Sequence, residues 1–131
     1  MPEEGDVINY CYLWRHEHAD GEEDGRKDRP CLVIVSEQRG ESRRIIVAPI
    51  TSQNFADATS LKVPPPFITQ LGLKPGSAIV ASDLNAFNWV SPDVRMRGKK
   101  HTHYGRLSSS LTDSVLAAAQ KLGSRPTART I

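Results

Sequence analysis

Apolar residues in this chain gather in short runs separated by charged or glycine-containing segments. Residues 7–14 (VINYCYLW) and 30–37 (PCLVIVSE) are rich in β-branched and aromatic side chains, which predicts two buried strands. A third run, residues 44–52 (RIIVAPITS), follows a short segment that contains Gly40. Two such runs joined in this way are typical of a β-hairpin, so we expect residues 30–37 and 44–52 to pair.

The middle of the chain predicts shorter elements. Residues 61–63 (LKV) fit a short strand, which we expect the prolines at 64–66 to end in an extended conformation. One helical turn that stops at Gly72 follows. Residues 78–85 (AIVASDLN) and 86–90 (AFNWV) predict two neighbouring strands.

The clearest helical pattern lies near the C-terminus, in residues 108–123 (SSSLTDSVLAAAQKLG). Apolar residues recur there at the spacing of one helical face, namely Leu111, Val115, Leu116, Ala119 and Leu122. We expect Ser110 as the N-cap, Asp113 in the first turn and Gly123 as the stop. Residues 124–131 predict a flexible tail.

These elements predict a mainly β fold, a small and partly open antiparallel barrel with the C-terminal helix packed on it. The chain has 131 residues, the size of one ordinary domain, which we assign to residues 1–123. No apolar run is long enough to span a membrane, and the N-terminus (MPEEGD) is acidic, unlike a signal peptide. We therefore expect a cytoplasmic protein with no membrane partner.

The cysteines and the charge distribution exclude few possible functions. Cys11 and Cys31 lie in apolar runs without metal-binding spacing, which predicts two small buried hydrophobic side chains. The formal net charge is only +2, but residues 17–24 are acidic and residues 95–106 (RMRGKKHTHYGR) hold five cations and no acid. The basic segment is either a solvated loop or a surface that faces phosphate.

Five motifs in order resemble the MazF/PemK toxins of bacterial toxin–antitoxin systems. They are GDVI (5–8), RKDRPCLVIV (26–35), VAPITS (47–52), AIVASD (78–83) and YGRLSSSL (104–111). The resemblance runs from about residue 5 to residue 122 and implies an SH3-like barrel of the MazF/CcdB type that forms a homodimer. It also implies a growth-inhibiting, metal-independent and cofactor-free endoribonuclease. Such enzymes cleave single-stranded RNA to 2′,3′-cyclic phosphate and 5′-hydroxyl ends, and a cognate antitoxin covers the groove with a flexible acidic tail.

By motif, the resemblance implies a catalytic arginine at Arg29 and a catalytic threonine at Thr51, with Asp83 and a first-loop histidine, His16 or His18, also taking part. We take His18 as the catalytic candidate of the two. Cleavage through a cyclic phosphate needs a base for the 2′-proton, a proton donor for the 5′-oxygen and positive charge for the phosphorane. Arg29 suits the third role because a guanidinium stays charged and binds two phosphate oxygens at once. Asp83 and a loop histidine remain alternative bases.

Further residues are candidates for contacts with RNA. They are His16, Lys27, Ser52, Trp89, Arg97, Lys99 and Lys100. Trp89, with Phe87, offers either a stacking platform for bases, an anchor for a protein, or ordinary core. The basic segment is equally a target for the antitoxin's tail.

The predicted hairpin also suggests why an arginine and a threonine stand at the ends of the two most apolar strands. Antiparallel strands bring the start of the first and the end of the second to one edge of the sheet, so Arg29 and Thr51 can face one cleft. Alternatively, Arg29 is a solvent-facing charge at a strand edge and Thr51 is a turn-forming hydroxyl.

Two rival functions remain open at this point. The pairs His16/His18 and His101/His103 have the spacing for metal binding on one face of a strand, but no cysteine or glutamate pattern completes a site, and we expect no metal. A small barrel can also serve as a non-catalytic module that binds RNA or protein, as the related gyrase-poisoning toxins do with a protein.

Overall fold

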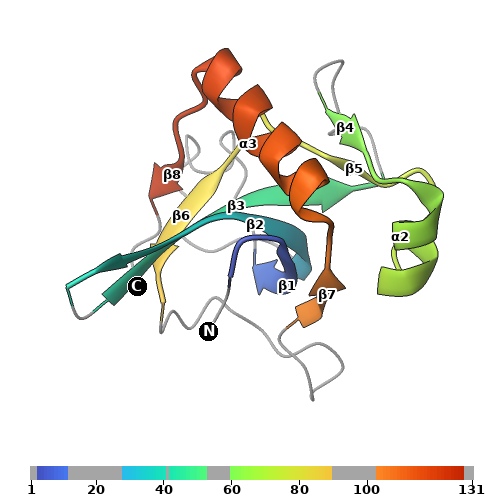
Figure 1. The fold of residues 1–131 in the computed structure, drawn as a ribbon, viewed down its shortest axis with the longest axis horizontal. Helices are drawn as coiled ribbons and strands as arrows, with labels where there is room; N and C mark the ends of the chain where they lie inside the picture. Colours follow the sequence, from blue (N-terminus) through green and yellow to red (C-terminus); the bar gives the residue numbers. More distant parts are fainter. Residues whose placement is uncertain (1–2, 12–27, 41, 53–59, 90–102, 129–131) are drawn as a thin grey trace.

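The computed structural model of the chain describes residues 3–11, 28–40, 42–52, 60–89 and 103–128, and nearly half of them belong to one curled, mainly antiparallel sheet (Figure 1). The strands of the described part are β1 (Asp6–Cys11), β2 (Asp28–Arg39), β3 (Ser42–Thr51), β4 (Leu61–Lys62), β5 (Ala78–Ile79), β6 (Asn85–Asn88), β7 (His103–Arg106) and β8 (Thr127–Ala128). Its helices are α2 (Pro65–Leu71) and α3 (Ser109–Leu122). The predicted mainly β class with a C-terminal helix is confirmed.

The strands β2 and β3 form the predicted hairpin, which is the longest element of the sheet. They pair antiparallel from Cys31 opposite Pro49 to Arg39 opposite Ser42. Both strands extend further toward Gly40 than their apolar runs, because the polar residues beside the turn also pair. A register shift between Val33 and Val35 marks a bulge, which increases the local twist of the strand.

The sheet curls because β3 changes partners along its length. Its first half pairs with β6, from Arg44 opposite Asn88 to Val47 opposite Asn85, and its end pairs with β5. The path through the sheet is β4-β5-β3-β2-β1-β7, with β6 joined to β3 and β8. β7 is an edge strand of the described sheet. This arrangement gives the half-barrel visible in Figure 1.

Two strand predictions in the middle of the chain are wrong. Residues 78–85 do not form one strand, because β5 ends at Ile79 and the chain turns at Ala81. The next strand, β6, is not the neighbour of β5 and pairs with β3 and β8 instead. Residues 80 and 81 are buried although they lie outside a strand, which explains why their apolar pattern resembles one.

The prolines begin a helix where an extended segment was predicted. Pro65 and Pro66 form the first turn of α2, where a missing N–H costs nothing and the fixed φ of proline suits a helix. The helix is therefore longer than the single turn expected. It ends as predicted at Gly72, whose φ is 66°.

The start of α3 also differs from the prediction. Its N-cap is Ser108, whose Oγ accepts a hydrogen bond from the N–H of Leu111 at 3.3 Å. Ser110 is already helical and Asp113 lies outside the first turn. Gly123, with a φ of 66°, ends the helix as expected.

The two sides of the β2–β3 hairpin face different cores. α3 packs its buried residues Val115 and Ala119 on the side that carries Leu32 and Ala48. Leu122, predicted to lie on the same helical stripe, is 43% exposed instead. No helix in the described part of the chain is long and apolar enough to cross a membrane.

We call the side of the hairpin that faces away from α3 the far face. Cys31, Val33, Ile45 and Val47 lie there in a second buried cluster with Tyr10 and Phe87. Because side chains alternate along a strand and register pairs share a face, the far-face residues can be read along both strands. They are Arg29, Cys31, Val33, Ser36 and Gln38 from β2, and Arg43, Ile45, Val47, Pro49 and Thr51 from β3. The prediction that Cys31 is buried is confirmed.

Candidate functional site

The hairpin register brings Arg29 and Thr51 to the same end of the sheet. The pair of Cys31 and Pro49 is the last that β2 and β3 form at this end, and Arg29 and Thr51 each lie two residues beyond it. Both residues therefore lie just beyond the paired part of the hairpin, at the same end of it. The antiparallel geometry on which the sequence argument depends is therefore present.

Neighbouring strands hold both residues in a largely buried setting. Arg29 pairs with Tyr10 of β1, and the Tyr10 side chain is completely buried. The guanidinium Nε of Arg29 is buried as well. Thr51 is only 4% exposed and pairs with Ala78 of β5. A guanidinium and a hydroxyl placed in this way are shielded from water on several sides. Shielding strengthens the attraction of such groups for an anion.

Asp83 lies in the turn between β5 and β6, not on a strand as predicted. The N–H of Val80 bonds to the carbonyl of Pro49 at 2.9 Å, which fixes the start of this turn beside the end of β3. On the other side, the Ser124 hydroxyl donates to the Ala81 carbonyl at 2.8 Å. Asp83 itself is half-buried.

The segment after α3 contributes to the same region, since Thr127 and Ala128 of the predicted tail form β8. Thr127 donates its N–H to the carbonyl of Leu84 at 2.8 Å, and β8 pairs in parallel with β6. The Asp83 turn is thus held between the end of β3 and the C-terminal segment.

Aromatic rings cover the middle of the far face. Tyr10 and Phe87 stack with ring centroids 4.9 Å apart and an angle of 17° between the planes. Phe87 is only 2% exposed and belongs to the core. Trp89 is half-buried and packs against the same cluster, so part of its ring remains accessible. Ser52 is exposed just after the end of β3.

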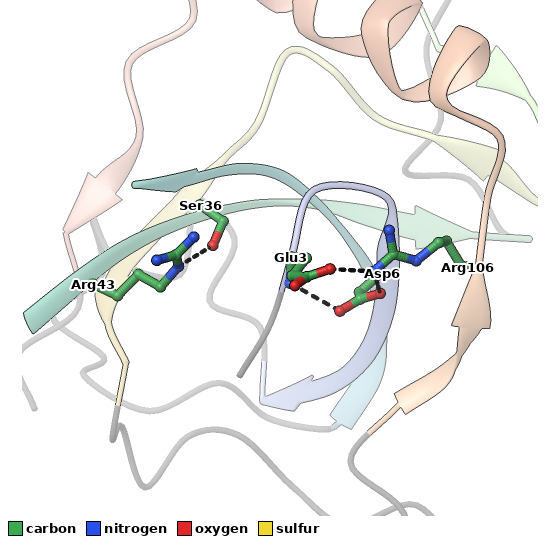
Figure 2. A network of polar contacts seen from close by, with 5 residues as sticks. All are labelled: Glu3, Asp6, Ser36, Arg43 and Arg106. Carbon is green, nitrogen blue, oxygen red and sulfur yellow. Dashed lines mark hydrogen bonds and ion pairs between the residues drawn. The ribbon is translucent and has the colours of Figure 1, made fainter. Parts of the chain in front are cut away.

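The last residue of the basic segment is engaged by carboxylates. Arg106 reaches Glu3 Oε2 at 2.8 Å and Asp6 Oδ1 at 3.0 Å, and the N–H of Glu3 donates to Asp6 Oδ2 at 2.8 Å (Figure 2). The hydrogen bond from Arg106 lowers the pKa of Glu3. The same hydrogen bond raises the pKa of Arg106. Arg106 therefore connects β7 to the start of β1. The two carboxylates largely neutralise its positive charge.

Six predicted site residues lie outside the described part of the chain, namely His16, His18, Lys27, Arg97, Lys99 and Lys100. Their proposed contacts with RNA, and the catalytic role of His18, stay predictions. Among the described residues, no group of three or more His, Cys, Asp or Glu side chains is placed to hold a metal ion.

Arg43 is a far-face residue that the sequence reasoning missed. The predicted strand began at residue 44, which left Arg43 in the turn, whereas β3 begins at Ser42. The missed signal was the two-residue spacing that links Arg43 to Ile45, Val47 and finally Thr51.

The described chain is thus a curled antiparallel half-barrel with a polar pair at one end of an apolar face and a C-terminal helix on the opposite side. A family model described as "PemK-like, MazF-like toxin of type II toxin-antitoxin system" matches residues 10–122, which is most of the chain. This chain belongs to that toxin family, and the resemblance seen in its motifs is confirmed. A search of curated proteins finds no significant match.

Proposed function

We propose that this protein is the toxin of a type II toxin–antitoxin system and that it cleaves single-stranded RNA without a metal ion. What supports the proposal is the position of Arg29 and Thr51 at one end of the far face, in a chain that the toxin-family model matches over residues 10–122. The products are a 2′,3′-cyclic phosphate and a 5′-hydroxyl end.

In the proposed reaction the RNA supplies its own nucleophile. The 2′-oxygen forms a bond to the adjacent phosphorus while the bond from phosphorus to the 5′-oxygen breaks. A base accepts the 2′-proton, and the 5′-oxygen receives a proton as it leaves. Asp83 and His18 are the two candidates for the base, and either would contribute about 10²- to 10⁴-fold in rate if its pKa lies near the working pH.

Arg29 and Thr51 act on the phosphate itself. The planar guanidinium of Arg29 binds two non-bridging oxygens and offsets the negative charge that grows on the phosphorane. The Thr51 hydroxyl donates a hydrogen bond to one of these oxygens and fixes the phosphorus in line with the 2′-oxygen. Each such donor in a shielded site contributes about 10²- to 10³-fold.

Membership of a type II toxin family implies an antitoxin partner. We propose that its acidic tail competes with RNA for Arg29, because a carboxylate and a phosphate present similar oxygens to a guanidinium. We also propose that the protein acts as a homodimer.

The test is incubation of the purified protein with a long unstructured RNA in the presence of a chelator. Discrete cuts are expected from the wild type, while Arg29→Ala and Thr51→Ala leave the RNA intact. Arg39→Ala is the matched control, since Arg39 is exposed at the opposite end of the hairpin and pairs with Glu37. If the folded wild type leaves the RNA intact, the protein is a binding module instead.

A further inference from the structure

The far face carries a second arginine at the end opposite to Arg29. Arg43 donates from Nε to Ser36 Oγ at 2.6 Å (Figure 2). It also donates from Nη1 to Gln38 Oε1 at 3.2 Å. These three residues come from both strands of the hairpin and share the far face. The two bonds fix the guanidinium plane and leave its other N–H donors for a ligand.

The acceptors of Arg43 are neutral, unlike those of other arginines nearby. In the part of the chain that the structure describes, Arg39 pairs with Glu37 and Arg106 with Glu3 and Asp6, while Arg43 forms no ion pair. Glu4 lies near this site, where its carboxylate accepts the backbone N–H of Ser36 at 3.3 Å. Arg43 acts on Glu3 only through space, as a minor influence that lowers the pKa of Glu3. The positive charge of Arg43 is thus not cancelled by direct contact with a described carboxylate.

Trp89 lies beside Arg43 on the same face. The backbone N–H of Trp89 donates to the backbone carbonyl of Arg43 at 2.7 Å, and this bond continues the β3–β6 register by one residue. Residues opposite one another in an antiparallel pair have neighbouring side chains on the same face. Trp89 also packs against the far-face cluster and is half-buried. A partly open indole beside an oriented guanidinium is a combination that suits a base and its phosphate.

We propose that Arg43 and Trp89 form a second anchor for the RNA strand, in which Arg43 binds a phosphate and Trp89 stacks on a base. The inference rests on the proposed ribonuclease function. Arg43 and Thr51 are eight residues apart on β3, about 26 Å along an extended strand. An RNA strand held at both anchors therefore spans about this distance. This anchor governs affinity for long substrates and leaves the chemical step at Arg29 and Thr51 unchanged.

The experiment measures binding of a fluorescently labelled single-stranded DNA oligonucleotide of about 16 nucleotides, at several salt concentrations. DNA lacks the 2′-hydroxyl, so it binds without being cleaved. Arg43→Gln should weaken binding and reduce the slope of log affinity against log salt by about 0.7, the value for one phosphate contact on a single strand. Trp89→Leu should weaken binding about 5- to 150-fold with little change in slope.

The matched control is Arg44→Gln. This substitution removes the same charge from the next residue of β3, which lies on the other face of the sheet. It should keep the wild-type slope, as should Arg43→Lys, which retains the charge. Thermal unfolding verifies that each variant is folded. Equal slopes for Arg43→Gln and Arg44→Gln, or no binding by the wild type, would overturn the proposal. If the DNA binding results agree with these expectations but the protein never cuts RNA, the proposed ribonuclease activity is contradicted. Arg43 and Trp89 are then still a binding site for single-stranded nucleic acid.

Discussion

Thr51 offers a sharp separation between catalysis and stability. The side chain is 4% exposed and carries a methyl and a hydroxyl of similar size. Thr51→Val replaces only the hydroxyl and preserves the volume and the branched shape that a strand favours. Thr51→Ser keeps the hydroxyl and removes only the methyl. If the hydroxyl holds the scissile phosphate, the valine variant cleaves RNA much more slowly than the serine variant.

The expected losses of stability are similar for the two variants. Removing one buried methyl group costs about 1 kcal/mol from lost burial and imperfect repacking. Removing a buried hydroxyl that is hydrogen-bonded also costs about 1 kcal/mol net. For a domain of this size each change lowers the melting temperature by about 4 °C. Stability alone therefore cannot separate their activities.

The activities should differ by about 10²-fold, the effect of one donor in a shielded anion site. The assay compares initial cleavage rates of one RNA at 25 °C, with melting temperatures measured on the same preparations. Cleavage by Thr51→Val at the wild-type rate would refute the role of the hydroxyl. A valine variant that melts far below the serine variant would instead show that the hydroxyl is needed for folding.

Two further predictions concern the framework around the site. Ser108→Ala should destabilise the protein by about 1 kcal/mol, because it removes the N-cap of α3. Ser110→Ala, at the exposed position that the sequence predicted as the cap, should destabilise it by less than about 0.5 kcal/mol. Urea unfolding of the two variants measures both free energies. The pKa of Glu3 lies below its ordinary value of 4.5 because Arg106 donates a hydrogen bond to it, so the stability from this pair is present above pH 4.5 and is lost as the pH falls through the lowered pKa. Glu3→Gln should therefore flatten the loss of stability below pH 4.5, and melting curves from pH 3 to pH 7 that run parallel for the two proteins would contradict this.

The relation between Arg29 and Thr51 was predictable from the sequence because local signals determine it. Two apolar runs with a glycine between them specify a hairpin, and an antiparallel hairpin places the start of one strand beside the end of the other. The register then depends on the turn at Gly40, close to the middle of the segment. No long-range information was needed.

The position of Asp83 was hard to predict, since the local turn signal is weak, a Ser82–Asp83 pair within an apolar run. Val80 and Ala81 are as buried as strand residues, and neither glycine nor proline marks the place where the chain leaves β5. The turn depends instead on distant partners, the carbonyl of Pro49 and the hydroxyl of Ser124. A pattern of apolar residues cannot reveal such contacts.

The start of α3 illustrates a choice among equal local signals. Residues 108–110 are all serine, and each satisfies the preference for an N-cap. The choice is made by the residue before them, because Leu107 is buried and its N–H bonds to the Gly5 carbonyl at 2.9 Å. This contact with the N-terminal segment fixes where the helix begins.

The most direct test of the central claim replaces one 2′-hydroxyl of an RNA that the protein cuts. Once a cleavage position is mapped, the nucleotide on the 5′ side of the cut is changed to its 2′-deoxy form, and the ends of the unmodified product are analysed. The account predicts a 2′,3′-cyclic phosphate and a 5′-hydroxyl from the unmodified RNA, and no cut at the deoxy position. Cleavage of the deoxy substrate, or a 5′-phosphate end, would show that water attacks the phosphorus and would contradict the account.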